Sequence, residues 1–282
     1  MPPSDLPNQP MPKRRLAVIW LSFIAFILAL CLAIAVQLDT VNRAKLRPKG
    51  PSTQHAMKLM GLVFTMYTED STGAHWPGLA SNQTVWAPEL SHVFPEYLID
   101  PAILVSSEHP GRDGILTTMY YVLDESNPDY ETAAGLMGLS FAYLGYAVKD
   151  EAGFAALVEA RNTGLLDGNR ENLSVPGHDA MVFPLREGIE RFFITDINGP
   201  AATAAMQSFI PVMIEIAGWK HKSSTESFGG TYVLYMDGHV AFVKLGNFPV
   251  IPEVMDVLSG LAKGLPAKSS PTESNAATTP HP

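Results

Sequence analysis

The sequence predicts an α+β protein in which an N-terminal transmembrane helix is followed by a second helix packed on an antiparallel sheet. Three observations support this fold class: an apolar run at 16–36, an apolar stripe at helical spacing within 55–69, and two β-rich segments, 231–236 and 239–245, separated by a turn. Strands that are close in sequence and joined by tight turns pair antiparallel, and a helix with one apolar face covers such a sheet.

The N-terminal apolar run predicts a membrane anchor. From Leu16 to Val36 every residue is apolar except Ser22, over 21 residues. A helix of this length spans roughly 31 Å, about the thickness of a bilayer's hydrocarbon core. The basic cluster at 13–15 favours a cytoplasmic N-terminus. We therefore expect a single-pass protein of the inner (cytoplasmic) membrane with its C-terminal domain outside the cytoplasm.

Three features leave alternatives to this anchor open. Basic residues within 43–49 follow the run, so the charge difference across it is small. Ala33-Ile34-Ala35 matches a small-x-small cleavage site. Leu28-Ala29-Leu30-Cys31 resembles a lipoprotein signal, which would place a lipid on Cys31. The run is longer than a usual signal peptide core and continues beyond Cys31, so a retained anchor is preferred.

Composition divides the chain into five segments. Proline and polar residues dominate both ends and predict disorder there, and the prolines and glycine at 48–51 predict a break after the anchor. The expected segments are a cytoplasmic disordered tail (1–15), the transmembrane helix (16–36), a juxtamembrane linker (37–54), an extracytoplasmic domain (55–264) and a disordered tail (265–282).

Hydrophobic periodicity and turn residues predict the elements of the domain. Helices are expected at 55–69, 89–98, 151–161, 201–209 and 250–261. Strands are expected at 117–123, 141–148, 189–195, 211–217, 231–236 and 239–245. Asp150 is the expected N-cap of helix 151–161. Asp237-Gly238 predicts a two-residue type I′ hairpin turn. The aromatic pairs Tyr120-Tyr121 and Phe192-Phe193 are expected in the core or on a sheet face.

Several functions are disfavoured by composition and motifs. The formal net charge of −9 is opposite to what phosphate binding needs, so we expect no nucleic-acid partner. Cys31, the single cysteine, lies in the apolar run, so the domain has no disulfide and no Cys-based zinc site. The segment 138–142 lacks the last glycine of a nucleophile elbow, and no glycine-rich phosphate loop occurs. We therefore expect no enzyme.

A family resemblance rests on the C-terminal part of the domain. Residues 228–244 read FGGTYVLYMDGHVAFVK, and further matching stretches lie at 57–77, 140–160 and 186–213. Together they resemble the prepilin-type, processing-associated proteins of planctomycetes, which are named for a His, nine residues and Asp-Gly. Those proteins are similar to pseudopilin G of type II secretion. The resemblance covers most of 55–245 and implies a pseudopilin-like helix packed on an antiparallel sheet.

The chain departs from that family at three places. Ser227 stands where the family has its His, and Glu215 stands where relatives often have Asp. The apolar run has no early glutamate, which the processing site of a prepilin contains. The run therefore resembles a permanent anchor and not the packing helix of a filament.

The candidate site residues lie at the hairpin. Asp237, Gly238 and His239 form the motif hairpin, and turn chemistry alone accounts for Asp237-Gly238 because both residue types tolerate a positive φ. The resemblance also implies calcium, which related pseudopilins hold with loop oxygens. The candidate calcium ligands here are Asp237, Glu215 and Asp196. No catalytic residue and no other cofactor is expected.

The observations favour a non-enzymatic, membrane-anchored pseudopilin-like protein that serves an assembly or scaffold linked to type II secretion or the cell surface. The expected partners are the membrane and either other proteins or further copies of this chain. The alternative is a membrane-anchored sensor domain that binds a ligand or calcium.

Overall fold

The computed structural model describes residues 52–81, 85–124, 126–166, 171–194, 200–217, 219 and 229–260. The predicted anchor 16–36, the tails 1–15 and 265–282, and most of the linker 37–54 lie outside these ranges. Within them, no helix is both long and apolar enough to cross a membrane.

The described residues form a mixed α+β fold with antiparallel sheets, which confirms the fold class at this level. The α-helices are α2 (Thr53–Asp70), α3 (Arg112–Val122), α4 (Tyr130–Met137), α5 (Glu151–Asn162), α6 (Pro200–Gln207) and α8 (Pro252–Leu258). The 3₁₀ helices are η1 (Leu90–His92), η2 (Pro101–Leu104) and η3 (Ile189–Phe193). The strands are β1 (Phe141–Tyr143), β2 (Tyr146–Ala147), β3 (Leu173–Ser174), β4 (Met181–Pro184), β5 (Pro211–Glu215), β6 (Gly230–Tyr235) and β7 (Val240–Lys244).

The larger sheet has the strand order β1-β5-β6-β7, and every neighbouring pair is antiparallel. A smaller sheet has the order β2-β4-β3. Gly145 lies between β1 and β2 with a φ of +68°, a conformation that glycine adopts without steric cost. The predicted strand 141–148 is therefore two strands, because the backbone turns at Gly145 and passes from one sheet to the other.

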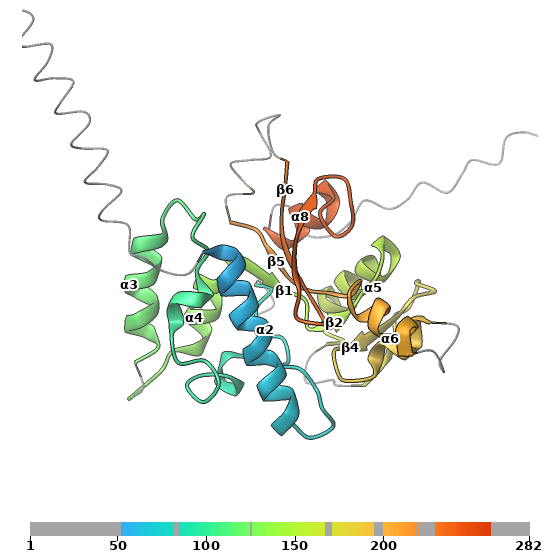
Figure 1. The fold of residues 1–282 in the computed structure, drawn as a ribbon, viewed down its shortest axis with the longest axis horizontal. Helices are drawn as coiled ribbons and strands as arrows, with labels where there is room; N and C mark the ends of the chain where they lie inside the picture. Colours follow the sequence, from blue (N-terminus) through green and yellow to red (C-terminus); the bar gives the residue numbers. More distant parts are fainter. Residues whose placement is uncertain are drawn as a thin grey trace, which may run out of the picture. The chain divides into compact units, whose positions relative to one another are not determined.

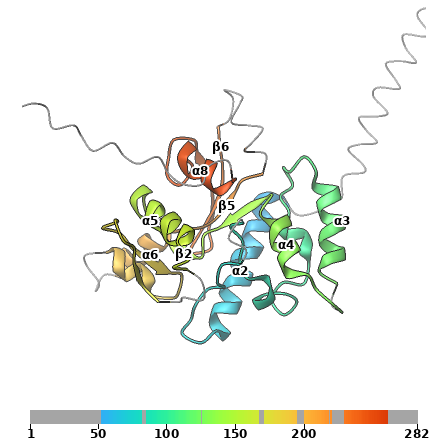
Figure 2. The same ribbon diagram turned by 180° about the vertical axis from the view of Figure 1, so that it is seen from behind.

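Helices cover both faces of the larger sheet, as Figures 1 and 2 show from opposite sides. Side chains alternate along β6, so Leu234 joins the core that contains α2, α3 and α4, while Val233 joins the core that contains α5 and α8. The central strands β5 and β6 each bond to a neighbour on both sides, so a partner can find unpaired backbone groups only at the outer strands of this sheet.

Helix α2 confirms the first helix predicted for the domain. Its buried residues include Ala56, Met60 and Phe64, which recur every four residues along one face. Gly61 brings the helix close to β6, since a Cβ at Gly61 would lie 3.1 Å from the side chain of Leu234. The helix-on-sheet contact expected from the sequence is thus present.

Other predicted elements are present with shifted ends. Helices 151–161, 201–209 and 250–261 correspond to α5, α6 and α8, and strands 211–217, 231–236 and 239–245 correspond to β5, β6 and β7. Asp150 caps α5 as expected, because its Oδ1 accepts a 2.9 Å hydrogen bond from the backbone N–H of Gly153. The helix expected at 89–98 shortens to η1 and the turns that follow it.

Two predicted strands are wrong because both segments are helical. Residues 117–123 belong largely to α3, whose buried residues Ile115, Leu116 and Met119 follow helical spacing. Residues 189–195 begin with η3, where Ile189 fills the core. Both segments are rich in β-branched and aromatic residues, and tertiary packing overrides the weak strand preference of such residues.

Three of the four aromatic side chains in the pairs Tyr120-Tyr121 and Phe192-Phe193 are mainly exposed, which corrects the prediction that they lie in the core or on a sheet face. The fourth, Phe193, is half-buried and packs against the core. Tyr120 is 51% exposed, Tyr121 82% and Phe192 57%. In a strand, one of two neighbouring tyrosines would point inward. In α3 the buried face is that of Ile115, Leu116 and Met119, and both tyrosines lie outside it. The sequence also gave no prediction for α4, β3 and β4.

Candidate functional site

The motif hairpin residues lie in the turn between β6 and β7, whose loop consists of Met236, Asp237 and Gly238. The N–H of Gly238 donates to the carbonyl of Tyr235 at 2.9 Å, and the N–H of Tyr235 donates to the carbonyl of His239 at 3.0 Å. Gly238 has a φ of +82°, whereas Asp237 has no positive φ. The turn is therefore a type I turn followed by a left-handed glycine bulge, and the predicted two-residue type I′ turn is wrong.

The Asp237 carboxylate is bound within the turn. Its Oδ1 accepts a 3.1 Å hydrogen bond from the N–H of His239 and lies 2.5 Å from Nδ1 of the same residue. The His239 ring stacks on Tyr235 with centroids 4.6 Å apart. Burial, and then the charge of Asp237, raise the pKa of Tyr235 above its ordinary value. These contacts give Asp237 a structural role at the end of the hairpin.

Glu215 is a buried carboxylate at the end of β5, only 4% exposed. One carboxylate oxygen accepts a 2.6 Å hydrogen bond from the hydroxyl of Ser106. The other lies 3.1 Å from the hydroxyl of Thr231 on β6, which also reaches the backbone carbonyl of Glu215 at 2.9 Å. Such partners are needed because a buried carboxylate has lost its hydration.

A chain of hydroxyl groups connects Glu215 to the first residue of α2. The hydroxyl of Thr53 lies 2.9 Å from that of Ser106 and 2.9 Å from that of Ser107. Each hydroxyl has one proton and Ser106 gives its proton to Glu215, so Thr53 donates to Ser106. The hydroxyl of Ser107 lies within reach of two acceptors, the hydroxyl of Thr53 and, at 3.3 Å, the carboxylate of Glu108. Hydrogen bonds aligned in this way reinforce one another. They hold the start of α2 against the sheet.

The structure does not bring the described calcium candidates together. The carboxylate of Glu215 contacts Thr231 near the start of β6, whereas Asp237 follows the end of that strand. Thr231 and Asp237 are six positions apart along a mostly extended chain, a distance of roughly 20 Å. Asp196 lies outside the described residues. Over the described part of the chain, no group of three or more His, Cys, Asp or Glu side chains has an arrangement suited to a metal ion.

Strand β7 is an open edge of the larger sheet. Backbone hydrogen bonds join Tyr235 to His239 at one end of the β6–β7 ladder and Leu245 to Gly229 at the other. In an antiparallel ladder every second residue bonds to the neighbouring strand, so the odd-numbered residues from 239 to 245 bond to β6. The backbone groups of Val240 and Phe242 therefore point away from β6. Among the described residues, no backbone hydrogen bond engages either of them outside the ladder. Unpaired groups of this kind are a template for another strand.

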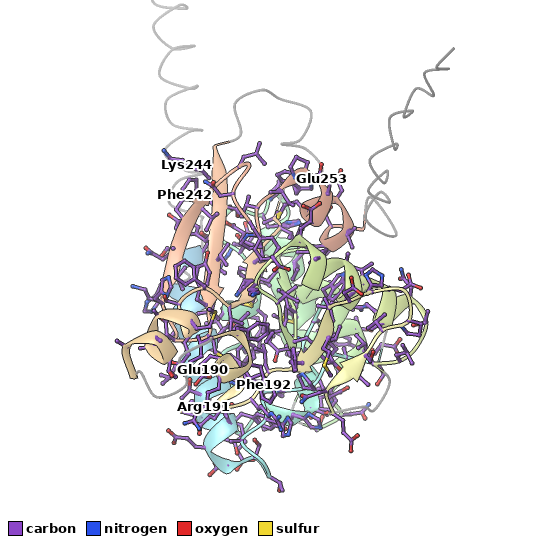
Figure 3. The ribbon with its side chains drawn as sticks, turned by 90° about the vertical axis from the view of Figure 1, so that its right-hand side faces the viewer. Glu190, Arg191, Phe192, Phe242, Lys244 and Glu253 are labelled. Atoms are coloured by element: carbon purple, nitrogen blue, oxygen red, sulfur yellow. The ribbon has the colours of Figure 1, made fainter. Side chains whose placement is uncertain are left out.

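An exposed aromatic side chain lies on this edge. Phe242 is 55% exposed, and its ring meets that of Tyr232 on β6 edge-on, with centroids 5.5 Å apart. Lys244 follows two residues later on the same face, and Leu245 is 40% exposed. Figure 3 shows Phe242 and Lys244 along one margin of the domain, apart from Phe192 on η3. The edge thus combines free backbone, an apolar ring and a positive charge.

The opposite edge of the sheet is covered. All three residues of β1 are buried, and the N–H of Tyr143 donates to the carbonyl of Trp86 at 2.8 Å. Trp86 belongs to a loop that is itself fixed by the guanidinium of Arg161, which lies 4.0 Å from the centre of the indole ring. Among the described residues, β7 is therefore the edge at which this sheet is open to a partner.

Sequence reasoning found the hairpin and Glu215 but missed the partners of Glu215 and the open edge. Ser106 is 109 residues from Glu215 in sequence, and no local pattern marks it. Strand order within a sheet is likewise not a local property. Among the described residues no strand follows β7 in the sequence.

Comparison with protein-family models, with curated proteins and with solved structures finds no significant match to this chain. The resemblance to pseudopilins therefore stays a prediction.

Proposed function

We propose that this chain is a non-enzymatic, membrane-anchored pseudopilin-like protein whose folded domain binds proteins through the edge of β7. One observation carries the proposal. The hairpin that resembles the pseudopilin motif in sequence ends the sheet with a strand whose Phe242 ring is exposed. The outward backbone groups of Val240 and Phe242 have no backbone partner among the described residues. Edge strands with these features add a strand from a partner, since main-chain hydrogen bonds supply affinity and side chains supply selectivity.

The order of elements agrees with a domain held at a membrane. The apolar run 16–36 precedes a linker, and α2 begins at Thr53, within the last two residues of the linker predicted at 37–54. The hydrogen-bond chain from Ser107 to Glu215 ties this first residue of the helix to β5. In the proposed protein this network is a structural clamp at the point where the chain enters the domain.

The binding surface is tested by site-specific photo-crosslinking in the full chain within its own membranes. A benzophenone amino acid at Phe242 is expected to crosslink the chain to a protein. The matched control places the same group at Tyr121, which is 82% exposed on α3. The proposal is contradicted if position 242 gives no crosslink or gives no more than position 121.

The membrane anchor is tested separately by fractionation. The full chain is expected to remain in the membrane pellet after alkaline extraction, because a spanning helix is not released by breaking electrostatic contacts. A chain lacking 16–36 is expected in the supernatant. Release of the full chain by alkali would show that the apolar run does not span the bilayer.

A further inference from the structure

We propose that the partner of β7 is β7 of a second copy, paired antiparallel about a two-fold axis at Phe242, so that two domains share one eight-stranded sheet. This inference rests on the proposed function, because it names the partner of the same edge. Its basis is that β7 is complementary to itself in shape, backbone pattern and charge.

The backbone pattern of β7 is symmetric about Phe242. Residues 240, 242 and 244 alternate with residues that bond to β6, so their N–H and C=O groups face away from β6. Among the described residues these groups have no backbone partner except the C=O of Lys244, which accepts a 3.1 Å hydrogen bond from the N–H of Asn247 and keeps one lone pair for a second donor. An antiparallel copy centred at Phe242 pairs Phe242 with itself and Val240 with Lys244 of the second copy. Outward groups then meet outward groups, and the two exposed rings lie side by side on one face.

The charges at the two ends of β7 are opposite. Asp237 lies in the turn that precedes the strand, and Lys244 ends it. A parallel arrangement would bring like charges together. The antiparallel arrangement places each Lys244 opposite Val240 of the other copy, three residues or roughly 10 Å from Asp237 of that copy. Charge therefore favours the antiparallel register and disfavours the parallel one.

The pairing closes on itself. In the part of the chain that the structure describes, the larger sheet has one open edge, because β1 is buried and bonded to the loop at Trp86. Two copies joined edge to edge consume both open edges, so this contact yields a dimer and not a fibre. Self-pairing thus removes the hazard that an exposed edge strand presents.

The length of β7 sets the strength of the contact. Five residues form the strand, and the pairing buries less surface than the roughly 1,200–2,000 Å² of a stable interface. The dimer is therefore weak for copies that diffuse freely and is favoured when anchors confine the copies to one membrane, which raises their effective concentration.

Disulfide crosslinking of the full chain in membranes tests the register. In a Cys31→Ala background, Phe242→Cys places two thiols on residues whose Cα atoms are about 5.5 Å apart in the dimer, within the range for a disulfide. The matched control Lys244→Cys is exposed on the same strand, but its two copies would be separated by four strand positions, roughly 13 Å. We expect an oxidised dimer with Phe242→Cys and its loss with Lys244→Cys. Absence of the first, or equal yields from both, overturns the proposal.

A charge substitution tests the contact without a crosslink. Phe242→Lys opposes two like charges at the axis, so the chain is expected to lose its dimer in bilayer discs or by photobleaching in membranes. The control Tyr121→Lys changes another exposed ring and should leave the dimer intact. A dimer that survives Phe242→Lys overturns the proposal.

Photo-crosslinking from position 242 distinguishes this inference from the proposed function. A crosslink only to a different protein would overturn the self-pairing and support the proposed function. No crosslink at all would contradict both.

Discussion

At the scale of single residues, Glu215 shows what local sequence conveys and what it omits. Glu215 lies within the apolar run 211–217, which predicts a strand, and β5 confirms this. Its role depends on Ser106, Thr231 and Thr53, which come from three other segments. A carboxylate flanked by apolar residues is costly to bury, so it implies partners, but only the fold identifies them. Sequence similarity suggested calcium instead.

Substitution of Glu215 tests the hydrogen-bond network. Glu215→Ala leaves the hydroxyl groups of Ser106 and Thr231 without their acceptor, and we expect a loss of about 3 kcal/mol in the free energy of unfolding. Thr231→Val keeps the side-chain shape and removes one donor, so its expected cost is about 1 kcal/mol. Urea unfolding of the two variants measures both values. Equal stability of Glu215→Ala and the unchanged chain would contradict the network.

Tyr120 makes a prediction about alkaline pH. The hydrogen bond that its hydroxyl donates to Asp100, at 2.7 Å, together with burial and the Asp100 charge, raises its pKa from 10.0 to about 12. Because the neutral phenol is favoured in the fold, this contact contributes stability below the unfolded pKa, and the contribution is lost as the pH rises through the folded pKa. The difference in tyrosinate absorbance between the unchanged chain and Tyr120→Phe reports Tyr120 alone. It should titrate with a midpoint near pH 12. A midpoint at the ordinary value would contradict the bond.

At the scale of elements, the helices and strands predicted correctly from the sequence are those whose ends are marked by a capping or turn residue. Asp150 and the hairpin residues Asp237-Gly238 mark α5 and the β6–β7 turn, and both elements are present. Helix α3 was predicted as a strand because its second half is rich in Thr, Tyr and Val. Its buried face, which starts at Arg112 and includes Met119, is defined by contacts with other elements. Residue preference alone could not reveal that face.

The hairpin depends on one glycine. Gly230 has a φ of +142°, and a Cβ there would lie 2.0 Å from the carbonyl oxygen of Val243 on β7. Gly230→Ala is therefore expected to lower the free energy of unfolding by at least about 2 kcal/mol. Gly229→Ala is the matched control, because its Cβ would meet nothing within 4 Å. Thermal unfolding compares them, and similar melting temperatures for the two variants would contradict the strand geometry.

At the scale of the whole molecule, the sheet has one covered edge and one open edge. Helices cover both faces, the loop at Trp86 covers β1, and β7 remains. The sequence predicted the strands of the hairpin but not the order β1-β5-β6-β7, in which the first strand pairs with one about 70 residues later. That order places the motif hairpin at the margin, and this placement supports a binding function for it.

Amide hydrogen exchange at β7 tests the central claim most directly. In the full chain within membranes, the amides of Val240 and Phe242 are expected to be as protected as those of Ala241 and Val243, because a partner strand bonds the outer groups as β6 bonds the inner ones. Phe242→Lys should abolish protection at 240 and 242 and leave 241 and 243 protected. Fast exchange at 240 and 242 in the unchanged chain, with 241 and 243 protected, would show that the edge of β7 has no partner.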